Sequence, residues 1–139
     1  MPLRLNPADD LPIYRQIMRQ IIDAIAGGRL SPGERLPSHR DLSEQLVIAP
    51  LTVKKAYDEL ERLGYVDQQH GRGTFVAATL PKVSRAERDA KLGDAARTLL
   101  RLAYLAGLEY ADVLGLLEAT DRKLTNRPAS SPPTGRGKS

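Results

Sequence analysis

The sequence contains no cysteine, so disulfide bonds and thiolate metal sites are excluded. It has two histidines, His39 and His70, which are far apart and fall on different expected elements. We therefore expect no structural zinc site. No nucleophile–base pair and no phosphate-binding loop stands out either, and Gly71-Arg72-Gly73 lacks the strand-then-helix context of a nucleotide loop. These absences predict a protein with no enzymatic activity and no cofactor.

Long hydrophobic runs are also missing. The most apolar stretch, residues 99–108, is interrupted by Arg101 and is far shorter than the roughly 20 residues that span a bilayer. Residues 1–6 contain no apolar segment of the signal-peptide kind. The sequence therefore predicts a cytoplasmic protein with no membrane partner, and a DNA-binding one would lie at the nucleoid.

The composition is that of a folded chain with a modest positive charge. Hydrophobic residues make up 41% of the 139 positions, which is enough to form a core, and the net charge is +4. Basic and acidic side chains balance over residues 1–80, so the excess lies in the second half. Bulk charge therefore does not locate a nucleic-acid site, and the placement of individual basic residues must do so.

The first half shows three helices followed by a hairpin. Isoleucines recur every four residues from Ile13 to Ile25, which predicts an amphipathic helix with Pro12 at its first position and Gly27-Gly28 at its end. Ser38, with Asp41 three residues later, resembles a capping box at the start of a short second helix. Pro50 fits the first position of a third helix, whose expected inward residues are Val53, Ala56, Tyr57, Leu60 and Leu63.

Two short strands are expected next, over residues 65–68 and 74–76, joined by His70-Gly71-Arg72-Gly73. After a connector, Ser84 and Glu87 form a second capping-box pattern in front of a long helix, and Gly107 separates it from a last helix. From about residue 125 the chain is rich in proline, serine and glycine, which predicts a disordered basic tail. Its Arg127, Arg136 and Lys138 add phosphate attraction or are simply solvated.

The third helix has the pattern of a DNA-reading helix. Its inward residues would leave Thr52, Lys54 and Lys55 exposed near its start, where they can contact phosphates or base edges of the major groove. An ordinary solvated helix face is the alternative. The glycines of the hairpin tip would let its backbone, together with His70 and Arg72, approach DNA closely, although a plain turn has the same composition.

Residues 12–76 resemble the GntR family of bacterial regulators. The segments that carry the resemblance are Pro12–Ile17, Ser31–Ser38, Arg40–Ser43, Thr52–Leu60, Gly64–Val66 and Gly71–Val76. The resemblance implies a winged helix-turn-helix that binds double-stranded operator DNA as a dimer. It also implies DNA contacts from Arg40, Thr52, Lys54, His70, Gly71 and Arg72, although Arg40 could instead pair with Asp41 or Glu44.

Three positions depart from the family pattern. Val47 stands where the family usually has glycine, and it is disfavoured if the turn needs a positive φ. Ala49 forgoes a side-chain N-cap worth about 1 kcal/mol. Leu51 replaces a usually polar residue and could touch a thymine methyl group or remain a plain surface residue. These changes bear on base preference and not on the fold.

The second half is too short for a large ligand-binding domain and most resembles the YtrA-like subfamily, whose short helical tails mediate dimerisation and which often controls transporter operons. Two such helices cannot enclose a core of their own, and residues 99–106 are apolar nearly all round. A second subunit, or else the chain's own winged domain, must cover them. The residues expected in a dimer interface are Leu92, Leu99, Leu100, Leu102, Ala103, Leu105, Tyr110, Val113, Leu114 and Leu117.

The sequence thus predicts a mainly α fold with a small β-hairpin: a winged helix-turn-helix followed by a short two-helix dimerisation tail. The expected parts are an arm (1–10), the DNA-binding domain (11–79), the dimerisation domain (80–124) and the tail (125–139). The expected function is a homodimeric repressor of a near-palindromic operator. The alternative is a winged-helix module that binds protein and not operator DNA. Whether a small-molecule effector binds is not decided by the sequence.

Overall fold

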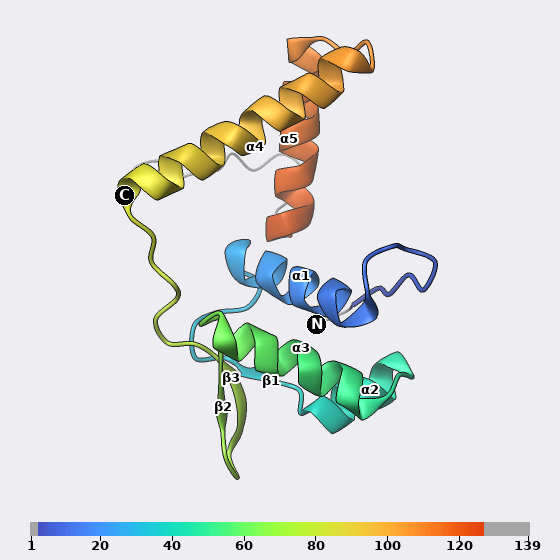
Figure 1. Cartoon of the computed structure of the whole chain (residues 1–139), viewed down its shortest axis with the longest axis vertical. Coiled ribbons are helices and arrows are strands. Elements are labelled where there is room, and N and C mark those ends of the chain that lie inside the picture. The colour runs from blue at the N-terminus through green and yellow to red at the C-terminus, as the bar shows by residue number, and fades with distance from the viewer. Residues whose placement is uncertain (1–2, 127–139) are drawn as a thin grey trace. The chain divides into compact units, whose positions relative to one another are not determined.

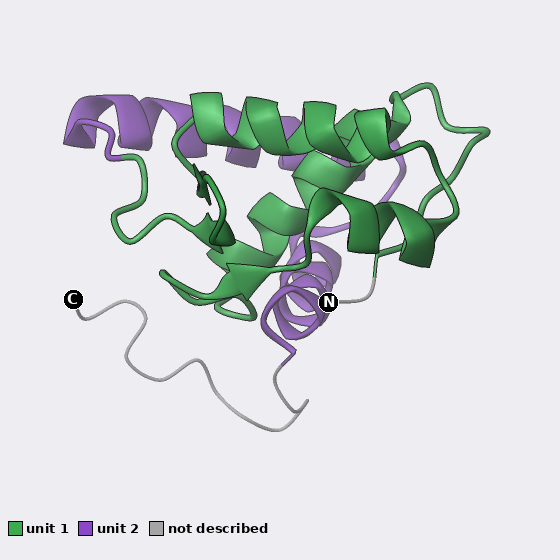
Figure 2. Ribbon diagram, turned by 90° about the horizontal axis from the view of Figure 1, so that it is seen from below, with its two compact units in different colours: residues 1–81 green, residues 82–139 purple. Residues whose placement is uncertain are grey.

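The computed structural model describes residues 3–126. Its elements follow in the order α1 (Ile13–Ala26), β1 (Arg35–Leu36), α2 (His39–Leu46), α3 (Pro50–Arg62), β2 (Val66–Gln69), β3 (Gly73–Val76), α4 (Arg85–Leu105) and α5 (Tyr110–Thr125) (Figure 1). The chain divides into two compact units, residues 1–81 and 82–139 (Figure 2). The first holds three helices and a small sheet, and the second holds the last two helices.

The core of the first unit lies where α1, α2 and α3 face one another and the sheet. The four-residue spacing that predicted α1 is confirmed, because Ile17, Ile21 and Ile25 are all buried. Tyr57 and Leu60 of α3 are also fully buried. The remaining buried hydrophobic residues of this core are Ala24, Leu30, Leu36, Leu42, Val53, Ala56, Val66 and Val76. This packing makes the first unit a domain with a core of its own.

The sheet has three antiparallel strands in the order β1-β3-β2, where only a hairpin was expected. The additional strand, β1, has two residues, with Arg35 opposite Phe75 and Leu36 opposite Thr74. A two-residue strand carries no alternation that a sequence pattern could reveal. In the hairpin itself, Val66 pairs with Val76 and Gln69 with Gly73. The hairpin extends beyond the helices of its unit as a narrow wing (Figure 1).

Four local expectations were wrong. Pro12 is the N-cap of α1, one position earlier than expected, and has an extended ψ of 150°. Leu63 is not an inward residue, because it caps the end of α3 and is 41% exposed. Strand β2 runs from Val66 to Gln69, one residue later than expected, and β3 begins at Gly73, one residue earlier than expected. Each error is a shift at an element's end, where hydrophobic periodicity has the least power to discriminate.

The N-terminal arm is held against α1 by two glutamines. The buried Gln16 side chain accepts a hydrogen bond from the Asn6 amide (2.8 Å) and donates to the carbonyls of Asn6 (2.9 Å) and Leu11 (2.8 Å). Gln20 exchanges a similar pair of bonds with the backbone of Arg4. The side-chain amides of Gln16 and Gln20 both donate to and accept from the backbone of the arm, as a neighbouring strand would in a sheet. These bonds hold residues 4–11 against α1 although they form no helix or strand.

The second unit is a pair of helices. Ser84 caps α4 by accepting a hydrogen bond from the Glu87 amide (3.1 Å), as its sequence predicted. Gly107 separates the helices with a φ of 85°. Helix α5 includes Thr125, one residue beyond the expected end of the helical region. The rest of the expected disordered tail, residues 127–139 with its three basic side chains, lies outside the described residues.

Candidate nucleic-acid interface

Helices α2 and α3 are joined by a tight turn, and a partly buried hydrogen bond ties α3 to the segment just before α2. Ser38 caps α2 by accepting a bond from the Asp41 amide (3.0 Å), as the sequence predicted. The Tyr57 hydroxyl of α3 donates to the Pro37 carbonyl just before α2 (2.7 Å), and burial raises the pKa of this phenol. The turn itself passes through Val47, whose φ of 56° and ψ of 52° are left-handed. The site that the family fills with glycine therefore does need a positive φ here.

The N-terminal end of α3 is open to solvent. Ala49 occupies the N-cap without a side-chain hydrogen bond, as expected. Leu51 is 77% exposed and Thr52 is half-buried. Arg40 is exposed on α2, and none of the ion pairs found within residues 3–126 joins it to Asp41 or Glu44. The side chains expected to meet DNA at this end are thus accessible.

Lys54 and Lys55, which the sequence placed together at one exposed helix start, point to different neighbours. Lys54 Nζ lies 3.1 Å from Oδ2 of Asp58, one turn further along α3. Lys55 Nζ lies over the ring of Tyr14 in α1, 4.3 Å from its centroid. A hydrogen bond from Arg15, together with the charges of Arg15 and Lys55, lowers the pKa of Tyr14. The two lysines therefore belong to different faces of the domain.

The wing presents the expected basic tip. The Arg72 amide donates to the Gln69 carbonyl (2.9 Å), which closes the turn, and Gly71 adopts a φ of 75°. His70, Gly71 and Arg72 are all exposed. At Gly73, a β-carbon would lie 2.9 Å from Nε of Arg35, so the absent side chain leaves room for this guanidinium beside the wing. A basic residue of β1 thereby joins the wing.

A groove runs between α3 and the wing and brings several of the expected residues together. Lys54, His70, Gly71 and Arg72 line it. Sequence reasoning missed the other residues that line it, which are Arg35, Ser38, His39, Asp58, Glu61, Gln68, Gln69, Gly73 and Thr74. Arg40, Leu51, Thr52 and Lys55 lie outside the groove. The residues expected to contact DNA are therefore divided among the groove, the start of α2, the start of α3 and the α1 side of the domain.

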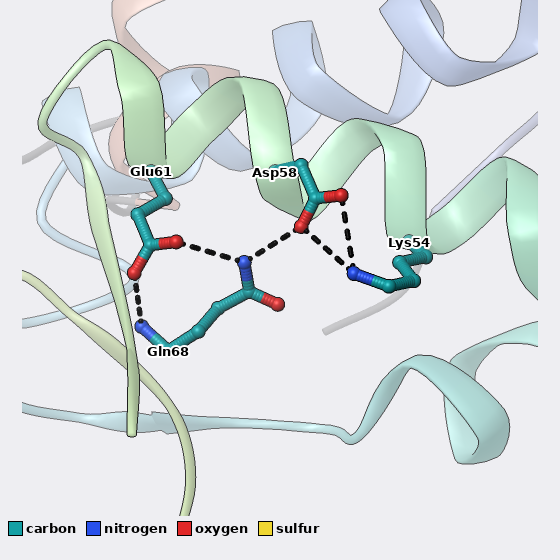
Figure 3. A network of polar contacts seen from close by, with 4 residues as sticks. All are labelled: Lys54, Asp58, Glu61 and Gln68. Atoms are coloured by element: carbon teal, nitrogen blue, oxygen red, sulfur yellow. Dashed lines mark hydrogen bonds and ion pairs between the residues drawn. The ribbon is translucent and has the colours of Figure 1, made fainter. Parts of the chain in front are cut away.

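A chain of hydrogen bonds on one side of this groove ties the wing to α3 (Figure 3). The Gln68 backbone amide and side-chain amide donate to Glu61 at 2.9 and 3.1 Å. The same side chain donates to Asp58 at 2.9 Å. The bond from Gln68, followed by the influence of Lys54, holds the pKa of Asp58 below its ordinary value. Because Gln68 lies seven positions from Glu61 and ten from Asp58 in the sequence, no short motif could have predicted these bonds.

Within residues 3–126 there is no group of three or more histidine or acidic side chains that could hold a metal ion. None of the helices in that same range is long and apolar enough to cross a membrane.

The family model "Bacterial regulatory proteins, gntR family" matches residues 13–76. The transcriptional repressor YtrA of Bacillus subtilis is 33% identical over 77% of this chain and 82% of its own length. The regulator Rv1152 of Mycobacterium tuberculosis is 36% identical over 83% of this chain and 90% of its own length. The chain belongs to the GntR family.

Two solved structures extend the likeness of this GntR-family protein beyond the winged domain. A transcriptional antiterminator from Listeria monocytogenes is 30% identical, with a TM-score of 0.72 over 90% of this chain and 93% of its own. YtrA from Sulfolobus acidocaldarius, a GntR-family transcription factor, is 36% identical, with a TM-score of 0.55 over 68% of this chain and 97% of its own. The winged helix-turn-helix fold and the YtrA-like subfamily are thereby confirmed. The protein is a DNA-binding transcription regulator, and its relatives are regulators and not enzymes.

The helix pair of this GntR-family regulator leaves most of its apolar side chains uncovered. Of the residues expected at a dimer interface, Ala103 and Val113 are buried and Leu99 and Leu100 are half-buried. The others are exposed in the single chain, and they are Leu92, Leu102, Leu105, Tyr110, Leu114 and Leu117. Leu108, Tyr104 and Leu116, which were not in that set, are exposed as well. Monomeric proteins rarely leave so many large apolar side chains open to water.

Proposed function

We propose that this regulator is a homodimeric repressor that binds a near-palindromic operator. The observation that carries the proposal is the groove in which Lys54 of α3 and Arg72 of the wing line one surface. A protruding helix beside a basic, glycine-tipped hairpin suits simultaneous contact with a major groove and the adjacent backbone or minor groove. The resemblance to the YtrA-like subfamily further supports a transporter operon as the regulated target. As a DNA-binding protein the regulator would act in the cytoplasm, at the nucleoid.

The residues expected to contact DNA then divide into three roles. Lys54 and Thr52 read base edges, and Leu51 packs on a thymine methyl group. Arg40 and Lys55 contact phosphates on either side of α3. The wing tip of His70, Gly71 and Arg72 follows the backbone. These roles assign residues 11–79 to DNA binding.

Dimerisation is assigned to residues 80–124. The exposed leucines of α4 and α5 form an apolar surface that another copy of the same pair would cover through a twofold interface. A twofold dimer places its two recognition helices about 34 Å apart, one turn of DNA, and so reads an inverted repeat. Because the interface and the DNA-reading surface lie in different units, each can be altered without the other.

The test begins with selection of duplexes from a randomised pool by the full chain, followed by footprinting of the enriched sequence. We expect an inverted repeat, and we expect affinity to fall steeply with salt, by about 0.9 in log–log slope for each phosphate contacted. Arg40→Ala, Lys54→Ala and Arg72→Ala should each weaken operator binding, while Arg19→Ala, an exposed arginine of α1 outside the groove, should not. Unchanged binding in all three variants would favour a protein-binding module instead.

A further inference from the structure

Lys54, the basic side chain of α3 that lines the groove beside the wing, forms an ion pair with Asp58. Both carboxylate oxygens of Asp58 lie within hydrogen-bond distance of Lys54 Nζ, at 3.1 and 3.2 Å (Figure 3). The two residues are one helical turn apart on α3, the spacing at which side chains of a helix meet. Both side chains are about half exposed and both line the groove. An acidic group therefore stands inside a surface proposed to meet a polyanion.

Asp58 is itself held in place from the wing. The side-chain amide of Gln68 donates to Asp58 Oδ1 at 2.9 Å, and Gln68 is anchored in turn by its two bonds to Glu61. These bonds also keep the pKa of Asp58 low, so the group remains a carboxylate at neutral pH. Lys54 is thus restrained by the carboxylate of Asp58, whose position is fixed in turn by Gln68 of β2. A stabilising role explains this arrangement poorly, because exposed ion pairs contribute little to folding.

The restraint has two consequences for DNA binding. An ammonium group has three N–H donors, so a lysine bonded to one carboxylate still has at least one donor for a base edge, in a direction that the pair sets. The negative charge of Asp58 also opposes any phosphate that approaches Lys54. Loose, sequence-independent contacts should suffer most, because they depend almost entirely on phosphate attraction.

We propose that Asp58 is a positioning residue that determines specificity, because it orients Lys54 toward a base edge and keeps it from binding phosphates indiscriminately. This inference rests on the proposed operator binding and deepens it. Asp58 lowers affinity for random DNA more than affinity for the operator, and so raises the ratio between them. Proteins commonly gain specificity by placing a repulsive group where charge attraction alone would bind every partner, here any DNA duplex.

The test compares the full-length wild type with Asp58→Asn, which keeps the shape and the hydrogen-bonding oxygen but removes the charge. The probes are the enriched operator duplex and a random duplex of equal length, across a salt series. We expect Asp58→Asn to bind the random duplex about 3- to 10-fold more tightly, with a salt slope steeper by about 0.9, and the operator-to-random ratio to fall correspondingly. Asp67→Asn is the matched control, because Asp67 is an exposed carboxylate of the same domain that lies outside the groove.

A double-mutant cycle separates action through Lys54 from a general gain of positive charge. In a Lys54→Ala background, Asp58→Asn should change the operator-to-random ratio by less than about twofold. An equal effect in both backgrounds, or an equal effect of Asp67→Asn, would overturn the inference. So would an unchanged random-duplex affinity, and in that case operator selection by the wild type would leave the proposed function intact. Failure of every protein in the series to bind any duplex would overturn both.

Discussion

The two units of this regulator use apolar side chains in opposite ways. In residues 1–81, leucine, isoleucine and valine side chains from three helices and three strands meet in one core, where Ile17, Ile21, Val53 and Leu60 are inaccessible to water. In residues 82–126, large apolar side chains are just as frequent along α4 and α5, yet Leu105 is 81% exposed. The first unit completes its hydrophobic core by itself, and the second requires another surface.

The difference originates in the pattern and not in the composition. Along α1 the apolar residues fall on one face, so packing on that side buries Ile17, Ile21 and Ile25 and partly buries the apolar residues beside them. Along α4 they spread around the helix from Leu99 to Leu105, and α5 can cover only the side that includes Ala103. A helix that is apolar on more than one side needs more than one partner. If the chain is a dimer, we therefore expect its separation to expose the apolar surface of the second unit and to leave the core of the first unit intact.

The largest expected effect comes from placing charges on the exposed apolar face. Leu102→Asp together with Leu105→Asp should weaken dimerisation by at least about 100-fold, because each carboxylate would be buried without a partner at a cost of about 3–5 kcal/mol. Operator affinity should fall with it, since the two recognition helices would no longer be linked. Sedimentation velocity over a concentration series measures the first effect and an operator-binding titration the second.

The control for this variant is Ala90→Glu, which adds a charge to an exposed position of the charged N-terminal half of α4. It should leave the dimer intact. The double aspartate variant should keep the far-ultraviolet circular dichroism of the winged domain, because no core residue changes. A double variant that still sedimented as a dimer would show that another surface joins the subunits. The exposed leucines of α4 and α5 would then not be explained by dimerisation.

A second prediction compares the same substitution in the two units. Leu60→Ala removes a fully buried side chain and should lower the free energy of unfolding by about 2–5 kcal/mol. Leu105→Ala removes an equally large side chain at 81% exposure and should change the stability of the isolated chain by less than about 0.5 kcal/mol. Urea denaturation at low protein concentration, where dimers are dissociated, measures both. Equal costs would mean that Leu105 is already covered within one chain.

A third prediction concerns the hydrogen bond that joins α3 to the residues just before α2. Tyr57→Phe removes the hydroxyl that donates to the Pro37 carbonyl and leaves that carbonyl without its partner inside the domain. The expected loss of stability is about 1–2 kcal/mol. Tyr65→Phe, which alters a half-buried tyrosine just before β2, is the matched control and should cost less. Thermal unfolding of both variants measures the two losses of stability, and an equal loss would show that the bond to Pro37 contributes nothing specific.

The sequence predicted the elements of the first unit well because each has a local cause. Isoleucines at four-residue spacing produced α1, Ser38 and Pro50 marked the starts of α2 and α3, and paired glycines marked the wing. Strand β1 was missed because its two residues depend on a pairing with β3 that is about forty positions away. Long-range pairing of that kind has no signature in a short window.

The candidate interface was predictable in its parts but not in its arrangement. Lys54 and the wing tip were identified as exposed basic features, and the structure places them in one groove. The charge that restrains Lys54 was overlooked, although Asp58 lies one helical turn away, because the pair acquires meaning only when Gln68 of the wing approaches it. Arg35 was overlooked for the same reason, since it reaches Gly73 through the unpredicted strand.

The smallest expected effects lie in the turn between α2 and α3, where the chain departs from its family. Val47 is 87% exposed and has a left-handed φ of 56°, so its branched side chain contributes strain and almost no packing. Val47→Gly should therefore raise the free energy of unfolding by about 1 kcal/mol, the cost of a left-handed residue less the added freedom of the unfolded chain. Ala49→Ser should add about 1 kcal/mol by capping α3.

Both substitutions lie in the winged domain, so their effects on the free energy of unfolding test whether the two units are stabilised independently. Urea denaturation should show the stabilisation equally in the wild-type background and in the Leu102→Asp, Leu105→Asp background. Val83→Gly makes the same substitution at a half-exposed connector residue whose φ is not positive, and it should bring no gain. If Val47→Gly destabilised the domain instead, the left-handed turn would carry no strain, and the valine at this position would need another explanation.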